Sequence, residues 1–450
     1  MRTGFFAIVL YLGSVASGCV RPAPDLHALY ANAARETDRT PVVVVHGILG
    51  ARLRDRAGGR ELWPGGFWRL LFDDYSDLRL PIDPATLEVL DDGLEPYDFF
   101  DGAVGEDFYG RLMATLTGPG GYHLRRIDDR PPNIYRFVYD WRRDNVENAS
   151  GLDDLIEEIR RQYRDPGLRV DIVAHSMGGI LVRYFERYGR EDVLEQDAVG
   201  VTGAGAGKLR KVVLIGTPNF GSISGLQTAL MGASIGFGTI RPEIGATWPS
   251  VYQILPNPAW DWMVDIRGRR VERDLFDVET WRYYGWSIFD SRARARIRAS
   301  FDDPAEANRY LETLERFMAK QLRRARRFHR ALSESQPTCP VRYIVFGGDC
   351  ILTPARCLVE EIEGRTVVRL SPGQIRRPLP GVDYDALMLE PGDGRVTKPS
   401  ALGRKSLDPS ARVADAAFPL AYAVFLCEEH GALPGDVTFR DNLLNILLSP

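Results

Sequence analysis

The sequence predicts an α/β fold in which a mostly parallel central sheet is flanked by helices. Short runs of β-branched and other apolar residues alternate along the chain with longer segments whose apolar residues recur at helical spacing. Unbroken apolar runs indicate strands that are buried on both faces, and their alternation with helices is typical of a parallel sheet. The predicted strands are 41–45, 134–139, 169–173, 209–215 and 341–346.

The bulk composition is that of an ordinary globular chain. Its 450 residues are 44% hydrophobic and 26% charged, which excludes the disordered and fibrous classes. The formal net charge of −4 provides no general attraction to nucleic acid, so no nucleic-acid partner is expected. The length is enough for two or three average domains, but α/β enzymes often use it for one core with insertions. The sequence makes no prediction of the oligomeric state.

The N-terminal segment 1–19 differs from the rest of the chain. Arg2 is its only charge, and the apolar run Phe5 to Leu12 is too short to span a bilayer as a permanent helix. Small residues follow this run. The segment is therefore predicted to be a secretory signal.

The end of this signal, Ala16-Ser17-Gly18-Cys19, resembles a bacterial lipoprotein signal, in which the Cys is lipidated and becomes the new N-terminus. Residues 20–40 are polar with two prolines and are expected to form a tether. We therefore expect an exported protein anchored through Cys19 to a membrane of the cell envelope, in the periplasm or at the outer membrane. The alternative is an ordinary signal cleaved near Ala16 or Gly18, with Cys19 incidental.

The pattern of the remaining cysteines favours disulfide bonds over a metal-binding site. Export makes disulfides permissible, and four cysteines allow three pairings that the sequence does not rank. Cys350 and Cys357 are close enough for a local loop, which is a weak indication. The pattern contains no C-x-x-C pair or His cluster, so no metal and no organic cofactor are expected. The four residues are Cys339, Cys350, Cys357 and Cys427.

The pattern around Ser176 predicts a nucleophile. The strand 169–173 leads into Ala174-His175-Ser176-Met177-Gly178, and a predicted helix over 178–188 follows at once. This arrangement is a nucleophile elbow, in which small residues two positions before and after the Ser keep a sharp turn free of collisions. The turn projects the Ser hydroxyl out of the sheet, and the helix N-terminus points N–H groups at a developing oxyanion. A five-residue match alone is weak, and the flanking strand and helix favour a nucleophile over a structural turn.

The loop after the first predicted strand supplies a candidate oxyanion hole. The run Gly47-Ile48-Leu49-Gly50 follows the strand 41–45, and its glycines permit a tight turn that faces the reacting carbonyl. The predicted donors are the backbone N–H groups of Met177 and Ile48, with Leu49 as the alternative to Ile48. A plain strand-to-helix turn is the other interpretation.

Chain order selects His430 as the general base. In this arrangement the triad runs Ser, then Asp or Glu, then His, and only two of the six histidines, His329 and His430, follow Ser176. His329 lies in the charged part of a predicted helix, where an exposed surface histidine is the simpler interpretation. His430 lies in a loop before a predicted C-terminal helix, where the base of such a triad is expected.

The orienting acid must lie between Ser176 and His430. Asp393 is flanked by glycines that permit a tight loop, whereas its rival Asp349 follows a predicted strand. We favour Asp393, partly on the family resemblance given below; it would hold His430 in one tautomer and stabilise its imidazolium.

Two long stretches interrupt the strand–helix alternation: a loop-rich one from about Ala51 to Asp107, and a larger one from about Gly221 to Pro337. The core is predicted to comprise 41–220 and 338–450, and the segment 221–337 is predicted to be a helical cap or lid. It ends in a helix over 304–332, with Asp302 or Asp303 as N-cap and Pro304 in the first turn. Its apolar part, Leu226 to Ile240 with nearby tryptophans, is expected either to contact lipid or to pack ordinarily against the core. The basic run Arg323 to Arg330 is interpreted as a solvated helix face rather than a site for lipid headgroups.

These motifs together resemble the lecithin:cholesterol acyltransferase-like family of α/β-hydrolases, in its bacterial branch. The resemblance covers the chain from Pro41 onward, and the order and spacing of its motifs are more specific than any one of them. It implies an α/β-hydrolase fold and maps the oxyanion loop, Ser, Asp and His of that family onto Ile48, Ser176, Asp393 and His430. The motifs are Gly47-Ile48-Leu49-Gly50, Leu62-Trp63, Tyr139-Asp140-Trp141-Arg142, Ala174-His175-Ser176-Met177-Gly178, Gly216-Thr217-Pro218-Asn219-Phe220-Gly221, Gly392-Asp393-Gly394-Arg395-Val396 and His430-Gly431.

The resemblance implies an esterase or acyltransferase that attacks glycerolipid or phospholipid esters, in contact with a lipid interface. The acyl group would pass through acyl-Ser176 to water or to a lipid alcohol. Two departures, His46 where the acyltransferases usually have Pro and Arg395 where Thr is common, leave transfer and hydrolysis both open. The alternatives are a small-ester or polyester hydrolase and a non-catalytic, lipid-binding envelope lipoprotein.

Overall fold

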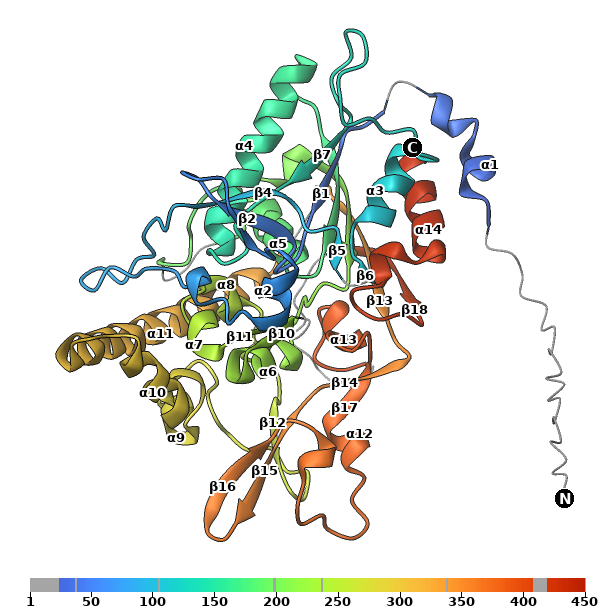
Figure 1. Cartoon of the computed structure of the whole chain (residues 1–450). Helices are drawn as coiled ribbons and strands as arrows, with labels where there is room; N and C mark the ends of the chain where they lie inside the picture. Colours follow the sequence, from blue (N-terminus) through green and yellow to red (C-terminus); the bar gives the residue numbers. More distant parts are fainter. Residues whose placement is uncertain are drawn as a thin grey trace, which may run out of the picture.

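The structure is a computed structural model that describes residues 24–36, 39–103, 106–196, 200–235, 238–336, 339–407 and 419–449. The predicted signal 1–19 and its Cys19 lie outside the described residues. Figure 1 shows a core with a central sheet in the upper part of the view and a second, smaller group of helices and strands below it.

The central sheet has six strands in the order β18-β13-β9-β8-β1-β7, and every neighbouring pair is parallel. Five of these strands coincide with predicted ones, so the predicted α/β class is confirmed. The edge strand β18 was not predicted. The bounds are β1 Val42–Val45, β7 Ile134–Phe137, β8 Val170–His175, β9 Leu209–Ile215, β13 Arg342–Gly348 and β18 Leu420–Leu426.

Helices cover both faces of this sheet, which explains the unbroken apolar character of its strands. In β1, Val43 and Val45 belong to a core cluster with helices α4 (Asn145–Tyr163) and α5 (Met177–Tyr188). Val42 and Val44 belong to a second cluster with α3 (Gly110–Thr117) and α14 (Val437–Leu448) on the opposite face. Successive side chains of a strand point to opposite faces, so each valine meets a helix layer.

The chain between β1 and β7 is a long excursion from the central sheet. It contains a small antiparallel sheet in the order β3-β2-β4. Trp63 of β3 donates its indole N–H to the carbonyl of Leu49 (3.0 Å), which ties this sheet to the predicted oxyanion loop. The elements are β2 Ala51–Asp55, β3 Glu61–Trp63, α2 Phe67–Phe72, η2 Ser76–Leu78, β4 Leu94–Phe99, β5 Gly102–Ala103, β6 Glu106–Asp107 and α3.

The segment 221–337 is largely helical and ends in the long helix α11 (Pro304–Ser333). Its start is as predicted, because the Asp303 carboxylate accepts from the Ala305 N–H at 2.8 Å and Pro304 occupies the first turn. His329, expected to be exposed, is instead buried against Phe276 and Phe328. The other elements are α6 Ile223–Met231, β10 Ala233–Ile235, β11 Gly238–Ile240, α7 Pro242–Gly245, α8 Pro249–Gln253, β12 Met263–Asp265, α9 Val278–Tyr284, η4 Ser287–Phe289 and α10 Ser291–Ala299.

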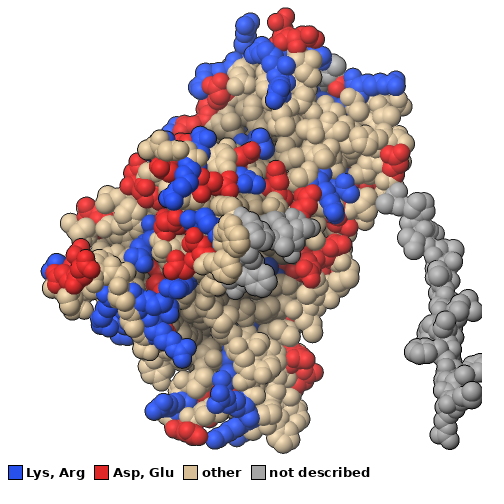
Figure 2. All heavy atoms as spheres, in the orientation of Figure 1, with Lys and Arg blue, Asp and Glu red and all other residues tan. Residues whose placement is uncertain are grey.

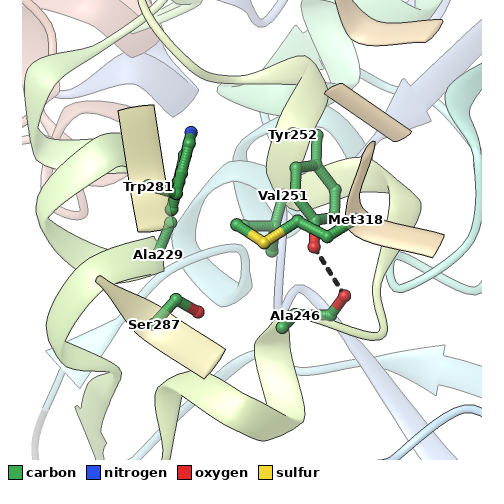
Figure 3. A pocket seen from close by; sticks show the side chains of 7 residues that line it. All are labelled: Ala229, Ala246, Val251, Tyr252, Trp281, Ser287 and Met318. Atoms are coloured by element: carbon green, nitrogen blue, oxygen red, sulfur yellow. Dashed lines mark hydrogen bonds between the residues drawn. The ribbon is translucent and has the colours of Figure 1, made fainter. Parts of the chain in front are cut away.

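The segment 221–337 is packed firmly on the core. Trp248 is 4% exposed and stands edge-on to Trp141 of the core, with ring centroids 5.0 Å apart. Ordinary packing therefore accounts for this tryptophan, and Trp260 and Trp262 are likewise buried. Within the segment a small crevice between α6, α8 and α11 is lined by Tyr252, whose hydroxyl donates to the carbonyl of Ala246 at 2.7 Å (Figure 3).

The basic run of α11 is matched by acidic side chains. Arg324 forms ion pairs with Asp144 at 2.5 Å, Asp192 at 2.7 Å and Glu195 at 3.3 Å. Arg327 also pairs with Glu195. Acidic and basic side chains are interspersed over the face seen in Figure 2. These contacts join the helix to the core.

A second excursion lies between β13 and β18 and was not predicted as a separate feature. Its strand β15 pairs in parallel with β12 of the segment 221–337, and the Cys357 N–H donates to the Trp262 carbonyl at 2.8 Å. The smaller group of elements in Figure 1 is therefore built from two stretches of chain rather than one. The elements are β14 Ile351–Pro354, β15 Cys357–Ile362, β16 Arg365–Arg369, η5 Pro372–Gln374, α12 Tyr384–Met388, β17 Leu389–Gly392 and α13 Lys398–Ala401.

The described part of the predicted tether is attached to the core. Residues 26–30 form helix α1 (Leu26–Tyr30), followed by η1 (Ala33–Arg35), and the Tyr30 hydroxyl donates to the carboxylate of Asp441 in α14 at 2.8 Å. Within the described ranges, no helix combines the length and the apolar character that crossing a membrane requires.

Candidate active site

Ser176 occupies the turn between β8 and α5, with φ 54° and ψ −127°. A non-glycine residue at positive φ is strained, and such strain is typical of a nucleophile elbow. The small residues are required: a Cβ on Gly178 would lie 2.3 Å from the carbonyl oxygen of His46, and Ala174 is fully buried. The predicted strand–turn–helix geometry is therefore present.

The structure brings Ser176, His430 and Asp393 into one hydrogen-bonded chain. The Nε2 atom of His430 lies 2.9 Å from the Ser176 Oγ, and its Nδ1 atom lies 2.9 Å from the Asp393 Oδ2. In addition, the backbone N–H of His430 donates to the backbone carbonyl of Asp393 at 2.9 Å. The acid is thus fixed to the histidine through both side chain and main chain.

Asp393 is held as a carboxylate although it is only 2% exposed. Burial by itself raises its pKa, but the His430 ring and the N–H groups of Val396 and Arg395 outweigh burial and hold the pKa below its ordinary value. Those N–H groups donate to Oδ1 at 2.7 and 2.9 Å, which leaves Oδ2 for the histidine. A charged Asp in this position favours the tautomer of His430 that carries its proton on Nδ1.

The rival acid, Asp349, does not contact His430. Its carboxylate pairs with the ammonium of Lys398 at 2.8 Å and is about one-third exposed. His329, the other histidine after Ser176, is buried within α11, and burial lowers its pKa to about 3. The geometry therefore assembles the triad that was favoured from the sequence.

The turn Gly47–Gly50 lies beside the nucleophile. It is closed by a hydrogen bond from the Gly50 N–H to the Gly47 carbonyl at 3.1 Å, and Leu49 takes a left-handed conformation with φ 63°. A Cβ on Gly47 would lie 2.8 Å from the Ser176 Cβ, so only glycine permits this approach. Among the residues that the structure describes, the N–H groups of Ile48, Leu49 and Met177 make no hydrogen bond.

His46, a departure from the acyltransferase pattern, supports this turn. Its ring stacks on Tyr139 with centroids 4.1 Å apart, and burial lowers its pKa to about 4. The Tyr139 N–H donates to Nε2 at 3.3 Å, so the remaining proton is on Nδ1 and is donated to the Gly47 carbonyl at 2.7 Å. Arg395, the second departure, is exposed, and its carbonyl accepts from the Ser222 hydroxyl at 2.6 Å.

Two glycines that sequence reasoning gave no role bring backbone against the triad. Gly216 has φ 54°, and a Cβ there would lie 2.9 Å from the His430 Nδ1 and 3.1 Å from the Asp393 Oδ2. A Cβ on Gly348 would lie 2.7 Å from the Asp393 Cβ. The sequence signal for Gly216 was its place after a buried strand, but only the fold shows what it faces.

A disulfide joins the loops around the triad. Cys350 and Cys427 are bonded across a sequence separation of 77 residues, whereas Cys339 and Cys357 are free. The local Cys350–Cys357 loop is therefore wrong, because Cys350 and Cys427 follow the adjacent parallel strands β13 and β18 and meet at the same edge of the sheet. Cys427 shortly precedes His430, so the disulfide lies on the loop that carries the base.

Comparison with known proteins agrees with this geometry. Residues 91–268 match the sequence model of the lecithin:cholesterol acyltransferase family. The family resemblance is confirmed. The matched segment contains Ser176 and the nucleophile elbow. A lecithin:cholesterol acyltransferase match supports a hydrolase or acyltransferase that acts on lipid esters. No curated protein sequence matches the chain at a significant level.

Solved structures that resemble this chain are distant from it in sequence. A chain of the Tle4–Tli4 complex is 14% identical, with 92% of this chain and 98% of that chain covered and a TM-score of 0.55. The lipase of Staphylococcus hyicus is 14% identical over 91% of this chain and 94% of its own, with a TM-score of 0.37. EstA from Clostridium botulinum is 13% identical over 91% and 87%, with a TM-score of 0.36. The predicted α/β-hydrolase fold is confirmed.

The described part of the chain was also compared with the arrangement of side chains that a metal ion requires. No group of three or more His, Cys, Asp or Glu side chains there is arranged to hold an ion. The acidic and imidazole groups at the site bond to one another and to backbone N–H groups instead.

Proposed function

We propose that the protein is a serine-dependent lipid esterase or acyltransferase that works through an acyl-Ser176 intermediate. The observation that carries the proposal is the hydrogen-bonded chain from the strained Ser176 through His430 to the buried Asp393. The family match over residues 91–268 supports lipid acyl esters as the substrate class.

In the proposed reaction His430 takes the hydroxyl proton of Ser176 through Nε2 as the oxygen attacks the ester carbonyl. The N–H groups of Met177 and Ile48 stabilise the oxyanion of the tetrahedral intermediate. The intermediate collapses to acyl-Ser176, and the leaving alkoxide takes the proton from His430. Water or an alcohol then donates a proton to His430 and attacks the acyl carbonyl; as the bond from the acyl carbon to the Ser176 oxygen breaks, His430 returns the proton to that oxygen and the acid or new ester leaves.

A lipid interface as the site of action is supported by exposed aromatic side chains near the oxyanion loop. Trp68 and Phe72 of α2 are 71% and 76% exposed, and their rings stack with centroids 6.0 Å apart. Helix α2 follows β3, whose Trp63 is bonded to Leu49. Large exposed aromatic groups are typical of surfaces that contact membranes.

Labelling with a fluorophosphonate tests the nucleophile. The wild-type protein is expected to react covalently at Ser176, and Ser176→Ala of unchanged thermal stability is expected not to react. Absence of labelling in the folded wild-type protein would contradict the proposal and favour a lipid-binding lipoprotein without activity. Chain-length preference on p-nitrophenyl esters, measured with and without vesicles, separates a lipid esterase from a small-ester or polyester hydrolase.

The acyl acceptor is proposed to be water or a lipid alcohol. The partly exposed Ser176 is compatible with both, since either acceptor must reach the same acyl carbonyl. Incubation with a phospholipid labelled in its acyl chain, with and without a sterol or another lipid alcohol, gives labelled fatty acid for hydrolysis and a labelled new ester for transfer.

Export and lipid anchoring are proposed on the strength of the N-terminal sequence alone. Lipidation of Cys19 would hold the enzyme at a membrane face of the cell envelope. Cys19→Ser is expected to shift the protein in gel mobility and to release it from the membrane fraction, whereas an unchanged distribution would favour an ordinary cleaved signal.

A further inference from the structure

A buried hydrogen-bonded chain connects the two loops that must act together on the substrate. Tyr109, directly before α3, accepts a hydrogen bond from the Gly47 N–H at its hydroxyl oxygen, at 2.9 Å. The same hydroxyl lies 2.9 Å from the Nδ1 atom of His175, and the Nε2 atom of His175 lies 3.2 Å from the backbone carbonyl oxygen of His430. Tyr109 and His175 are only 3% and 6% exposed.

The donors and acceptors fix the direction of this chain. The carbonyl of His430 can only accept, so the Nε2 atom of His175 must carry a proton. The Nδ1 atom of the neutral ring is then an acceptor, and the Tyr109 hydroxyl donates to it. Because a backbone N–H can only donate, the Gly47 N–H donates to Tyr109. One tautomer satisfies every partner.

Burial keeps both groups neutral. It lowers the pKa of His175 to about 3, with the neighbouring His430 adding to the effect, and it raises the pKa of Tyr109 above its ordinary value. His175 therefore retains a single ring proton over the range in which an esterase works. That proton is committed to the His430 carbonyl.

The segment that carries Tyr109 also touches the base loop directly. A Cβ on Gly431, the residue after His430, would lie 2.9 Å from the ring of Phe108, so ring and backbone are in close contact. Phe108 and Tyr109 thus contact the base loop and the oxyanion loop, respectively. These contacts leave the loops little freedom to move independently.

We propose that Tyr109 and His175 are positioning residues that set the oxyanion loop and the loop of His430 at the separation required for attack by Ser176. This inference rests on the proposed serine mechanism. Neither side chain makes a hydrogen bond to a triad side chain; both are hydrogen-bonded to the loops through the Gly47 N–H and the His430 carbonyl, and the His175 ring also lies beside the His430 ring, with centroids 4.9 Å apart. Small misplacement of reacting groups costs as much as ~10²-fold in rate.

Tyr109→Phe removes the hydroxyl and keeps the ring. We expect kcat to fall by about 10- to 100-fold with KM within about twofold, because transition-state geometry is altered more than substrate binding. The matched control is Tyr252→Phe, which removes another buried tyrosine hydroxyl bond, to the Ala246 carbonyl, far along the chain in α8. A similar loss of thermal stability in both variants, with kcat lowered only in Tyr109→Phe, is the expected result.

Two substitutions of His175 cut the chain at different links. His175→Asn places its amide near the Nδ1 position, so it keeps the hydrogen bond to Tyr109 and loses the one to the His430 carbonyl. His175→Gln places its amide near the Nε2 position, so it keeps the hydrogen bond to the His430 carbonyl and loses the one to Tyr109. Both His175→Asn and His175→Gln are expected to lower kcat while KM changes little. If Tyr109→Phe does not fold, these two variants decide the question.

The rate of fluorophosphonate labelling separates this inference from the proposed mechanism. Labelled wild-type protein with slower labelling of Tyr109→Phe supports both. Wild-type labelling with an unchanged rate and kcat in Tyr109→Phe and both His175 variants would overturn the positioning role alone. An unlabelled wild-type protein would overturn the mechanism and the positioning role with it.

Discussion

The Nε2 atom of His430 lies 2.9 Å from the Oγ of Ser176, across a sequence separation of 254 residues. Two features maintain this pairing from the histidine side: the hydrogen bond to Asp393 and the disulfide at Cys427. From the serine side it is maintained by the strained turn at the end of β8.

Substitution of each candidate acid by Asn tests whether Asp393 or Asp349 is the acid of the triad. Asp393→Asn is expected to lower kcat by about 10⁴-fold, because an amide next to Nδ1 favours the wrong tautomer of His430. Asp349→Asn, the matched control, loses an ion pair with Lys398 and is expected to keep kcat within a fewfold. Ester hydrolysis by the two purified variants is the measurement, and the reverse order of losses would contradict the assignment.

A methyl group at Gly216 is expected to separate the triad. Gly216→Ala would place a Cβ 2.9 Å from the His430 Nδ1, so the ring or the carboxylate must move, and kcat is expected to fall by about 10²-fold or more. Gly364→Ala is the control, because Gly364 also has positive φ but a Cβ there meets nothing within 4 Å. Equal activity of the two variants would show that the close approach at Gly216 is not required.

The disulfide is expected to stabilise the fold and hold the base loop. By the loop-entropy argument, closing a loop of 77 residues stabilises the folded state by about 4 kcal/mol. Cys350→Ala with Cys427→Ala is therefore expected to lower the urea midpoint markedly, and to lower kcat at temperatures where the protein is still folded. Cys339→Ala, which alters a free cysteine, is expected to leave kcat unchanged.

Acid is expected to destabilise the protein over a defined range. Burial lowers the pKa of His46 to about 4 and of His175 and His329 to about 3, whereas the unfolded chain titrates near the ordinary value of about 6.5. Between about pH 6.5 and about pH 4 the unfolded state therefore binds more protons than the folded state, so the free energy of unfolding falls as the pH falls. Each histidine contributes about 1.4 kcal/mol per pH unit, and the three together about 4 kcal/mol per pH unit near pH 5.

Urea titrations between about pH 7 and about pH 5 measure this slope. His329→Gln is expected to reduce the slope by about one-third, because one of the three histidines that bind a proton on unfolding is removed. Tyr252→Phe, which removes a buried hydrogen bond without altering a histidine, is the control and is expected to leave the slope unchanged. A slope that His329→Gln does not alter would mean that the buried ring is not the source.

Loss of the exposed aromatic side chains is expected to weaken vesicle binding. Trp68→Ser with Phe72→Ser should reduce binding to phospholipid vesicles by about tenfold or more, since each removes large apolar area from the interface. Hydrolysis of a water-soluble short-chain ester should be nearly unchanged. Tyr283→Ser, which alters a 62% exposed ring on α9, is the control. Equal vesicle binding by all variants would place the interface elsewhere.

Local sequence was sufficient to predict the elbow, because strand, turn and helix are contiguous around Ser176. His430 followed from chain order and from the small number of histidines. Asp393 needed the family resemblance as well, because its flanking glycines alone did not decide between it and Asp349. The buried strands were predicted from their apolar runs, whereas the edge strand β18 was missed although its residues 420–426 are also an unbroken apolar run.

Contacts between distant segments were not predictable in this way. The partner of Cys350 depends on the adjacency of β13 and β18, which sequence does not show. The burial of His329 depends on what packs against α11, because its neighbours in sequence are charged. Tyr109 gave no signal, since it lies outside any motif and meets Gly47 and His175 only in the folded chain.

The pairing of β12 with β15 affects how this protein can be re-engineered. Exchange of the segment 221–337 alone for that of another α/β-hydrolase would remove β12 and leave the edge of β15 without its partner. The same exchange would also remove Asp261, which forms an ion pair with Lys405. The segment 221–337 and the excursion between β13 and β18 are joined by this pairing, so a chimera must exchange both together.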